Sequence, residues 1–151
     1  MADIKEVLVK SVLFKDLSDA ELDQVLPLCR EKSYAAGFSV ISEGDVARDL
    51  YIIAEGKVIV EMSLSVYPGM GQEALVEIIP SDEPFGWSAV VGSRVYTMTA
   101  RCAEATKVIA IGGEHLLSLF NGSPAIGFKV MEGLVEVVDA RIKSIVRTAF
   151  E

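Results

Sequence analysis

The chain has 151 residues, enough for one domain with a sizeable core but not comfortably for two. Its 22 acidic residues outnumber 14 basic ones, and the net charge of -8 argues against a chain that grips nucleic acid by itself. Hydrophobic residues make up 51% of the sequence, so we expect some apolar surface to be buried against a partner, most simply a second copy.

The sequence gives no sign of secretion, membrane insertion or catalysis. The start "MADIKEVLVK" has charges where a signal peptide needs an apolar core, and no apolar run approaches the ~20 residues of a membrane span, so we expect a cytoplasmic protein with no membrane contact. Cys29 and Cys102 are too far apart for a redox pair, and with the single His115 they cannot make a zinc site. We therefore predict two buried or half-buried free thiols, no metal site, no catalytic residue and no enzymatic activity.

Two short helices are predicted near the N-terminus. Ser18 and Glu21 form an S-x-x-E capping box, which places the start of a helix near Asp19. The apolar residues that follow it at helical spacing are Leu22, Val25, Leu26 and Cys29. The upstream segment "IKEVLVKSVLF" has one apolar face and predicts a weaker helix.

From Lys32 the apolar period changes from helical to alternating. Short runs of Val, Ile, Tyr and Phe are cut by glycines at 37, 44 and 56 and by "PGMGQ" at 68–72, which is typical of antiparallel strands joined by tight turns. Later strand candidates are "EALVEII", "YTMTARC" and "TKVIAI". About eight strands with helices only at the two ends predict a mainly β fold, a cupin-like jelly-roll barrel.

The last third of the chain is predicted to be helical. A short helix covers "EHLLSLFN", and Ser123-Pro124 then supplies an N-cap residue followed by proline at the first helical position. We expect one long helix from Pro124 to Phe150 that pairs with its twin in a homodimer, because its apolar positions keep near-heptad spacing. These positions are Ile126, Val130, Met131, Leu134, Val137, Val138, Ile142, Ile145 and Val146.

The segment "GFSVISEGDVARDLYIIAEGKVIVE" resembles the cyclic nucleotide-binding domain superfamily, which includes catabolite activator proteins. The residues that carry the resemblance are Gly37, Ile41, Glu43, Gly44, Asp45, Leu50, Tyr51, Ile52, Ile53, Glu55 and Gly56. The resemblance covers nearly the whole chain and implies one domain: N-terminal helices over 1–31, a jelly roll over 32–112, and a short helix plus a long dimerisation helix over 113–151. We expect the three glycines to serve turn geometry and not a ligand.

In that family a phosphate-binding cassette lies between two strands, and by position "FGWSAVVGSR" is the cassette here. Members that bind cyclic nucleotides usually read Phe-Gly-Glu, a small residue, Ala, then Arg; the arginine and backbone N–H groups hold the phosphate, and the glutamate accepts from the ribose hydroxyl. Trp87 stands at the glutamate position, and the connection is about two residues shorter than usual. The ligand-binding candidates carried over from the resemblance are Phe85, Gly86, Trp87, Ser88, Ala89, Arg94, Tyr96 and Thr97.

The replacement by Trp87 predicts weak cyclic nucleotide binding, because an indole has one donor and no acceptor for a ribose hydroxyl. Two interpretations of the indole stay open: a plug that fills the former pocket, or a wall on which a ligand stacks. Arg94 is interpreted as an anion clamp, or alternatively as a solvated turn residue. The alternation of Arg94, Tyr96, Met98 and Ala100 predicts one shared strand face. Glu83 is a candidate for the missing carboxylate.

The leading functional hypothesis is a non-enzymatic regulatory domain that binds a small anionic or nucleotide-like effector in the jelly-roll pocket and signals through the long helix. The effector would be cyclic AMP, cyclic GMP or another small anion. The alternative is a constitutive dimeric scaffold whose pocket has lost ligand binding. A cupin enzyme is disfavoured because one histidine cannot build the usual metal site. The sequence ends at Glu151 without a helix-turn-helix, so we expect either a fragment of a larger regulator or a protein that acts through a downstream partner.

Overall fold

A computed structural model describes residues 3–63 and 74–149 of the chain. Within these residues the helices are α1 (Ile4–Lys10), α2 (Asp19–Val25), α3 (Gly113–Gly122) and α4 (Pro124–Ala149), with short 3₁₀ turns η1 (Leu26–Leu28) and η2 (Trp87–Ala89). The strands are β1 (Cys29–Tyr34), β2 (Ser39–Ile41), β3 (Asp49–Glu55), β4 (Val58–Ser63), β5 (Ala74–Ile79), β6 (Pro84–Phe85), β7 (Thr99–Cys102) and β8 (Thr106–Gly112). The predicted mainly β fold with terminal helices is confirmed.

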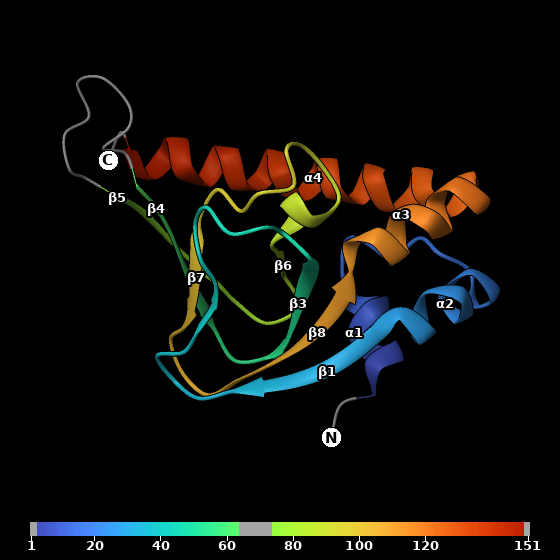
Figure 1. The fold of residues 1–151 in the computed structure, drawn as a ribbon, viewed down its shortest axis with the longest axis horizontal. Helices are drawn as coiled ribbons and strands as arrows, with labels where there is room; N and C mark the ends of the chain where they lie inside the picture. The colour runs from blue at the N-terminus through green and yellow to red at the C-terminus, as the bar shows by residue number, and fades with distance from the viewer. Residues whose placement is uncertain (1–2, 64–73, 150–151) are drawn as a thin grey trace.

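The strands form two antiparallel sheets that enclose the core. Their orders are β1-β8-β3-β6 and β2-β7-β4-β5, so strands distant in sequence pair with each other as in a jelly roll. Both central strands of the first sheet are apolar runs whose side chains are almost wholly buried, β3 through Ile53 and β8 through Ile111. Figure 1 shows α4 lying along one side of the barrel, with α1 and α2 gathered at one end.

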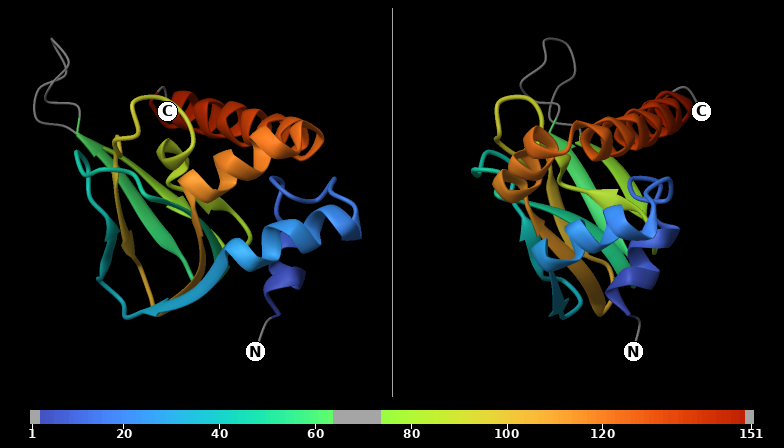
Figure 2. Two further views of the ribbon diagram at one scale, coloured as in Figure 1. Left: turned by 45° about the vertical axis from the view of Figure 1, so that its right-hand side comes forward. Right: turned by 90° about the vertical axis from the view of Figure 1, so that its right-hand side faces the viewer.

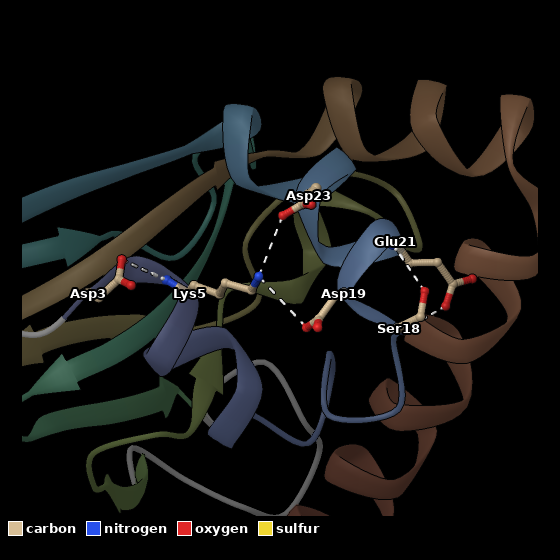
Figure 3. Close-up of polar contacts among 6 residues, drawn as sticks. All are labelled: Asp3, Lys5, Ser18, Asp19, Glu21 and Asp23. Atoms are coloured by element: carbon tan, nitrogen blue, oxygen red, sulfur yellow. Dashed lines mark hydrogen bonds and ion pairs between the residues drawn. The ribbon is translucent and has the colours of Figure 1, made fainter.

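The N-terminal prediction is correct in its main features. Ser18 accepts from the backbone N–H of Glu21 at 3.2 Å, and Glu21 accepts from the backbone N–H of Ser18 at 2.9 Å, so the capping box is complete (Figure 3). Lys5 of α1 lies 3.7 Å from Asp19 and 3.6 Å from Asp23, which joins the first two helices.

Cys29 is the first residue of β1 and not the last turn of α2, as its spacing had predicted. Pro27 follows Leu26 directly and has no N–H to continue the helical ladder, so the chain tightens into η1 and then extends. The Cys29 thiol donates to the carbonyl of Val25 at 3.5 Å, and burial raises its pKa to about 12. Both cysteines are free, as expected.

The turn glycines at 37, 44 and 56 all have positive φ, which agrees with their predicted role. The predicted break at 68–72 and residue Phe150 lie outside the described residues. None of the helices in residues 3–63 and 74–149 is both long and apolar enough to cross a membrane.

The long helix α4 presents two different apolar stripes, which the sequence prediction had merged into one. The stripe facing the barrel consists of the buried residues Ile126, Val130, Leu134 and Val137. The second stripe, which we call the outer seam, contains Phe128, Met131, Val135, Val138 and Ile142. Their spacing alternates between three and four residues, which is a heptad pattern. In the end-on view of Figure 2, α4 lies on the barrel with one side against it and one side open.

Candidate functional site

The cassette begins where β6 ends. β6 pairs with β3, with Phe85 opposite Tyr51, and their rings stack with centroids 5.1 Å apart. Gly86 follows with φ of 77°, a left-handed conformation that favours glycine. A Cβ at Gly86 would also lie 3.3 Å from the carbonyl oxygen of Asp49 and 3.4 Å from the ring of Tyr96. Glycine is therefore favoured by the backbone angle, and any side chain here would also need its neighbours to shift slightly.

The ring of Trp87 packs towards α4. The guanidinium carbon of Arg141 lies 4.8 Å from the centroid of the indole ring, in cation–π geometry. The indole also forms one end of a groove of about 470 Å³ whose other apolar lining residues are Val91, Met131, Leu134, Val135, Val138 and Ile142. The cassette and the long helix are thus in direct contact through this side chain.

Tyr96 takes the position inside the barrel that the sequence interpretation had offered to Trp87. Its side chain is 6% exposed, and its hydroxyl donates to the carbonyl of Asp49 at 2.7 Å and accepts from the N–H of Asp49 at 3.3 Å. Burial raises the pKa of Tyr96, so the hydroxyl keeps its proton. The sequence could have indicated this position for Tyr96 through the size of its ring. A large side chain two positions after Arg94 leaves less room in the barrel.

The cavity left inside the barrel at the cassette, which we call the inner cavity, has a volume of about 10 Å³. It is lined by Ile41, Gly86, Trp87, Ser88, Tyr96, Thr97 and Met98. This space suits about one water molecule, whereas small-molecule sites usually measure ≈ 300–1,000 Å³. Among the described residues, this cavity therefore leaves no room for a nucleotide.

Five of the predicted site residues line the inner cavity: Gly86, Trp87, Ser88, Tyr96 and Thr97. Phe85 and Ala89 are instead buried packing residues, 0% and 3% exposed. Arg94 is exposed and belongs to the lining of a different cavity on the outer side of the cassette.

The prediction that Arg94 and Tyr96 share one strand face is wrong. β7 begins only at Thr99, and the preceding segment turns sharply because Gly92 and Arg94 both have positive φ, 72° and 62°. An isolated bridge between Val46 and Val95 and a 2.8 Å bond from the Ala47 N–H to the Arg94 carbonyl hold the turn in place. Strand alternation does not apply to residues in such a turn.

Arg141 is a functional candidate that the sequence interpretation missed. Its side chain is 10% exposed, lies 3.6 Å from Glu83 and donates to the carbonyl of Pro84 at 3.1 Å. Burial lowers the pKa of Arg141, and the charges of Glu83 and Glu77 oppose that shift. Glu83 therefore pairs with the helix and does not lie in the inner cavity, so it does not replace the missing carboxylate there. Among the described residues, Nη1 of Arg141 has no hydrogen-bond partner.

Within residues 3–63 and 74–149, no group of three or more His, Cys, Asp or Glu side chains could hold a metal ion.

Comparison with known proteins identifies the family of this chain. Residues 31–123 match the family model described as the cyclic nucleotide-binding domain. The chain belongs to the cyclic nucleotide-binding domain family. The family is one of regulatory sensors, and the resemblance drawn from the Glu-Gly-Asp and Glu-Gly turns is confirmed.

One curated relative is similar to most of this chain. The cyclic AMP receptor protein of Thermus thermophilus is 28% identical over 116 residues, which are 77% of this chain and 52% of that protein. The chain therefore spans about half the length of that curated relative.

Solved structures share the fold. A putative cyclic nucleotide-binding protein from Geobacter metallireducens superposes with a TM-score of 0.79 at 24% identity, covering 93% of this chain and 99% of that one. The regulatory domain of Toxoplasma gondii PKA, solved with cAMP, gives a TM-score of 0.65 at 23% identity and covers 79% of this chain and 42% of that one.

Proposed function

We propose that this domain is a non-enzymatic regulatory module that reports the state of its cassette through α4. The contact between Trp87 and Arg141 carries this proposal, because it joins the cassette to the long helix through two partly buried side chains. Arg141 also holds Glu83 and the carbonyl of Pro84, the two residues directly before Phe85. A shift of the cassette would therefore change three interactions of one helical residue.

The proposed effector is a small anionic or nucleotide-like molecule, with cyclic AMP or cyclic GMP as the first candidates from the family. Its entry into the barrel requires Tyr96 to move. That movement would break both hydrogen bonds with Asp49 and expose the ring, at a cost of roughly 2–4 kcal/mol. Each 1.4 kcal/mol lowers affinity about tenfold, so this displacement alone should weaken binding roughly 30- to 700-fold. The missing ribose acceptor at Trp87 should weaken it further, so cyclic nucleotides should bind no tighter than roughly the millimolar range.

The proposed partner is a second copy of the chain, bound through the helix predicted over 124–150. The outer seam supports this assignment, since Val135 and Ile142 are 67% and 54% exposed and continue the heptad spacing. Trp87 and four of the five outer-seam residues line the same groove, so a dimer contact through the seam would lie directly beside the cassette.

A second candidate function is a constitutive dimeric scaffold that binds no effector in the barrel. The volume of the inner cavity, about 10 Å³, favours it. The two candidates differ in whether the cassette ever responds to a ligand.

Calorimetric titration with cyclic AMP and cyclic GMP, together with the emission of Trp87, separates them. For a sensor we expect weak heats and a shift of Trp87 emission at about millimolar nucleotide. The variant Tyr96→Ala should bind at least tenfold more tightly, because the ring no longer has to be displaced. Trp87→Glu alone should bind little better, since Tyr96 still fills the barrel.

The control is Tyr34→Ala, which removes a tyrosine that stacks on Phe38 and is not part of the inner cavity lining. If neither the wild type nor Tyr96→Ala binds nucleotide at about 10 mM, the scaffold function is favoured. Micromolar binding by the wild type would show that Tyr96 does not close the site.

A further inference from the structure

A second cavity lies on the outer side of the cassette, and we call it the outer cavity. Its volume is about 290 Å³, close to the lower limit for small-molecule sites. Four separate parts of the fold line it: β1, the loop before β3, the cassette and the start of α3. The charged or titratable lining residues are Arg30, Arg48, Asp49, Arg94, Glu114 and His115.

The outer cavity is positive in a strongly acidic chain. Three arginines face two carboxylates, +3 and -2, which leaves +1 with His115 neutral, against -8 for the whole chain. Asp49 is already engaged, because its carboxylate accepts from Arg30 at 2.9 Å. Within the part of the chain that the structure describes, the side chains of Arg48 and Arg94 enter no ion pair. Two guanidinium groups at this cavity are therefore available to an anion.

The backbone around the outer cavity favours the same charge. α3 begins at Gly113 with no side-chain cap, so the positive end of a ten-residue helix lies beside the arginines. The carbonyl of Arg48 accepts from the Gly113 N–H at 2.8 Å, which holds the backbone of Arg48 at the N-terminus of α3. Arg94 is held there by its bond to Ala47 in spite of its left-handed φ.

We propose that the outer cavity binds a compact polyanion with phosphate or carboxylate groups, independently of any ligand in the barrel. The arginine fork matches both groups in bidentate geometry, and a site of this volume admits only a small molecule. Arg94, the arginine of the cassette, would thus bind an anion in the outer cavity and not in the inner cavity.

Such a ligand would join the cassette to the helices. Arg94 and Ala89 belong to the cassette, and Ala89 packs so closely on Gly113 that a Cβ at Gly113 would clash with the Ala89 carbonyl. Because α3 leads directly into α4, occupancy would fix the cassette against the start of this helical pair.

The test is calorimetric titration with pyrophosphate and, separately, with citrate at low ionic strength. We expect pyrophosphate to bind the wild type, and Arg48→Ala and Arg94→Ala each to weaken binding at least tenfold. Arg147→Ala is the matched control, because it removes an exposed arginine from α4, outside the lining of the outer cavity. Thermal melts establish that each variant is folded. A stronger response to citrate than to pyrophosphate would assign the carboxylate as the recognised group.

Met98→Ala separates this site from the barrel, because Met98 lines the inner cavity and not the outer cavity. Its pyrophosphate affinity should equal that of the wild type. Absence of binding by both anions at about 10 mM would overturn the proposal, as would an equal loss in Arg147→Ala. A loss of pyrophosphate binding in Met98→Ala, with Arg48→Ala unaffected, would place the anion in the barrel instead.

Discussion

The guanidinium of Arg141 lies over the indole of Trp87, 4.8 Å from the ring centroid, and so fastens the cassette to the long helix. An arginine buried to this degree needs compensation, which it obtains from Glu83, the Pro84 carbonyl and the indole face. Trp87 cannot accept a hydrogen bond from a ribose hydroxyl, but its ring joins the cassette to α4.

Trp87→Ala should destabilise the domain by about 2 kcal/mol, because it removes a large ring and leaves Arg141 with one fewer partner. Trp87→Phe keeps an aromatic face and should cost about half as much. Urea unfolding measures both changes. Since Trp87 is the only tryptophan, its emission should also shift in Arg141→Met. Unchanged emission in that variant would mean that the two side chains do not touch in solution.

Much of the fold could be predicted because local chemistry decides it. The capping box needs only Ser18 and Glu21, and the turn glycines need only their freedom at positive φ. The order of helices and strands then follows from where the apolar period changes.

The site was less predictable because tertiary contacts decide it. Strand alternation was applied to Arg94 and Tyr96, but Gly92 and Arg94, both with positive φ, turn the chain there. The destination of the Trp87 ring depends on Arg141, 54 positions later in the sequence. On α4, the barrel-facing stripe and the outer seam both have helical spacing, so the sequence alone does not distinguish them. Only the position of the barrel shows which residues belong to which stripe.

The ion pair of Glu21 with Lys129 should make stability depend on pH. The Lys129 ammonium donates to Glu21 at 2.7 Å, and this bond, followed by the Ser18 N–H, lowers the pKa of Glu21 below its ordinary value of 4.5. A depressed carboxylate pKa contributes stability above pH 4.5, and this contribution is lost as pH falls through the folded-state pKa.

The free energy of unfolding should therefore be higher for the wild type than for Glu21→Gln above pH 4.5, and the difference should shrink on acidification. Urea unfolding at a series of pH values measures it. Glu136→Gln is the control, because its pair with Lys15 spans 3.7 Å between two exposed side chains and should contribute little. A gap between wild type and Glu21→Gln that stays constant to pH 2 would contradict the assignment.

Gly133 lets α4 approach the segment between α1 and α2. A Cβ there would lie 2.5 Å from the carbonyl oxygen of Val12 and 3.0 Å from the Cα of Leu13, both backbone atoms. Alanine gains about 1 kcal/mol of helix propensity over glycine, but the displaced backbone should cost more, so Gly133→Ala should lower the melting temperature. Gly122→Ala is the control, since nothing lies within 4 Å of its Cβ, and it should be neutral or stabilising. A raised melting temperature for Gly133→Ala would show that the packing there is loose.

The outer seam of α4 makes the dimer testable without damage to the core. Val135 is 67% exposed, whereas its neighbour Leu134 is 6% exposed and belongs to the barrel-facing stripe. Val135→Glu should therefore leave the monomer folded and raise the dimer dissociation constant about a hundredfold or more, because symmetry buries two carboxylates in the seam. Leu134→Glu should instead lower the stability of the monomer itself.

Sedimentation equilibrium gives the dissociation constant, and circular dichroism gives the melting temperature. Lys143→Gln, on the same helix but outside the seam, should change neither. A Val135→Glu protein that remains a dimer of undiminished stability would show that the copies meet through another surface, and the outer seam would then need a different partner.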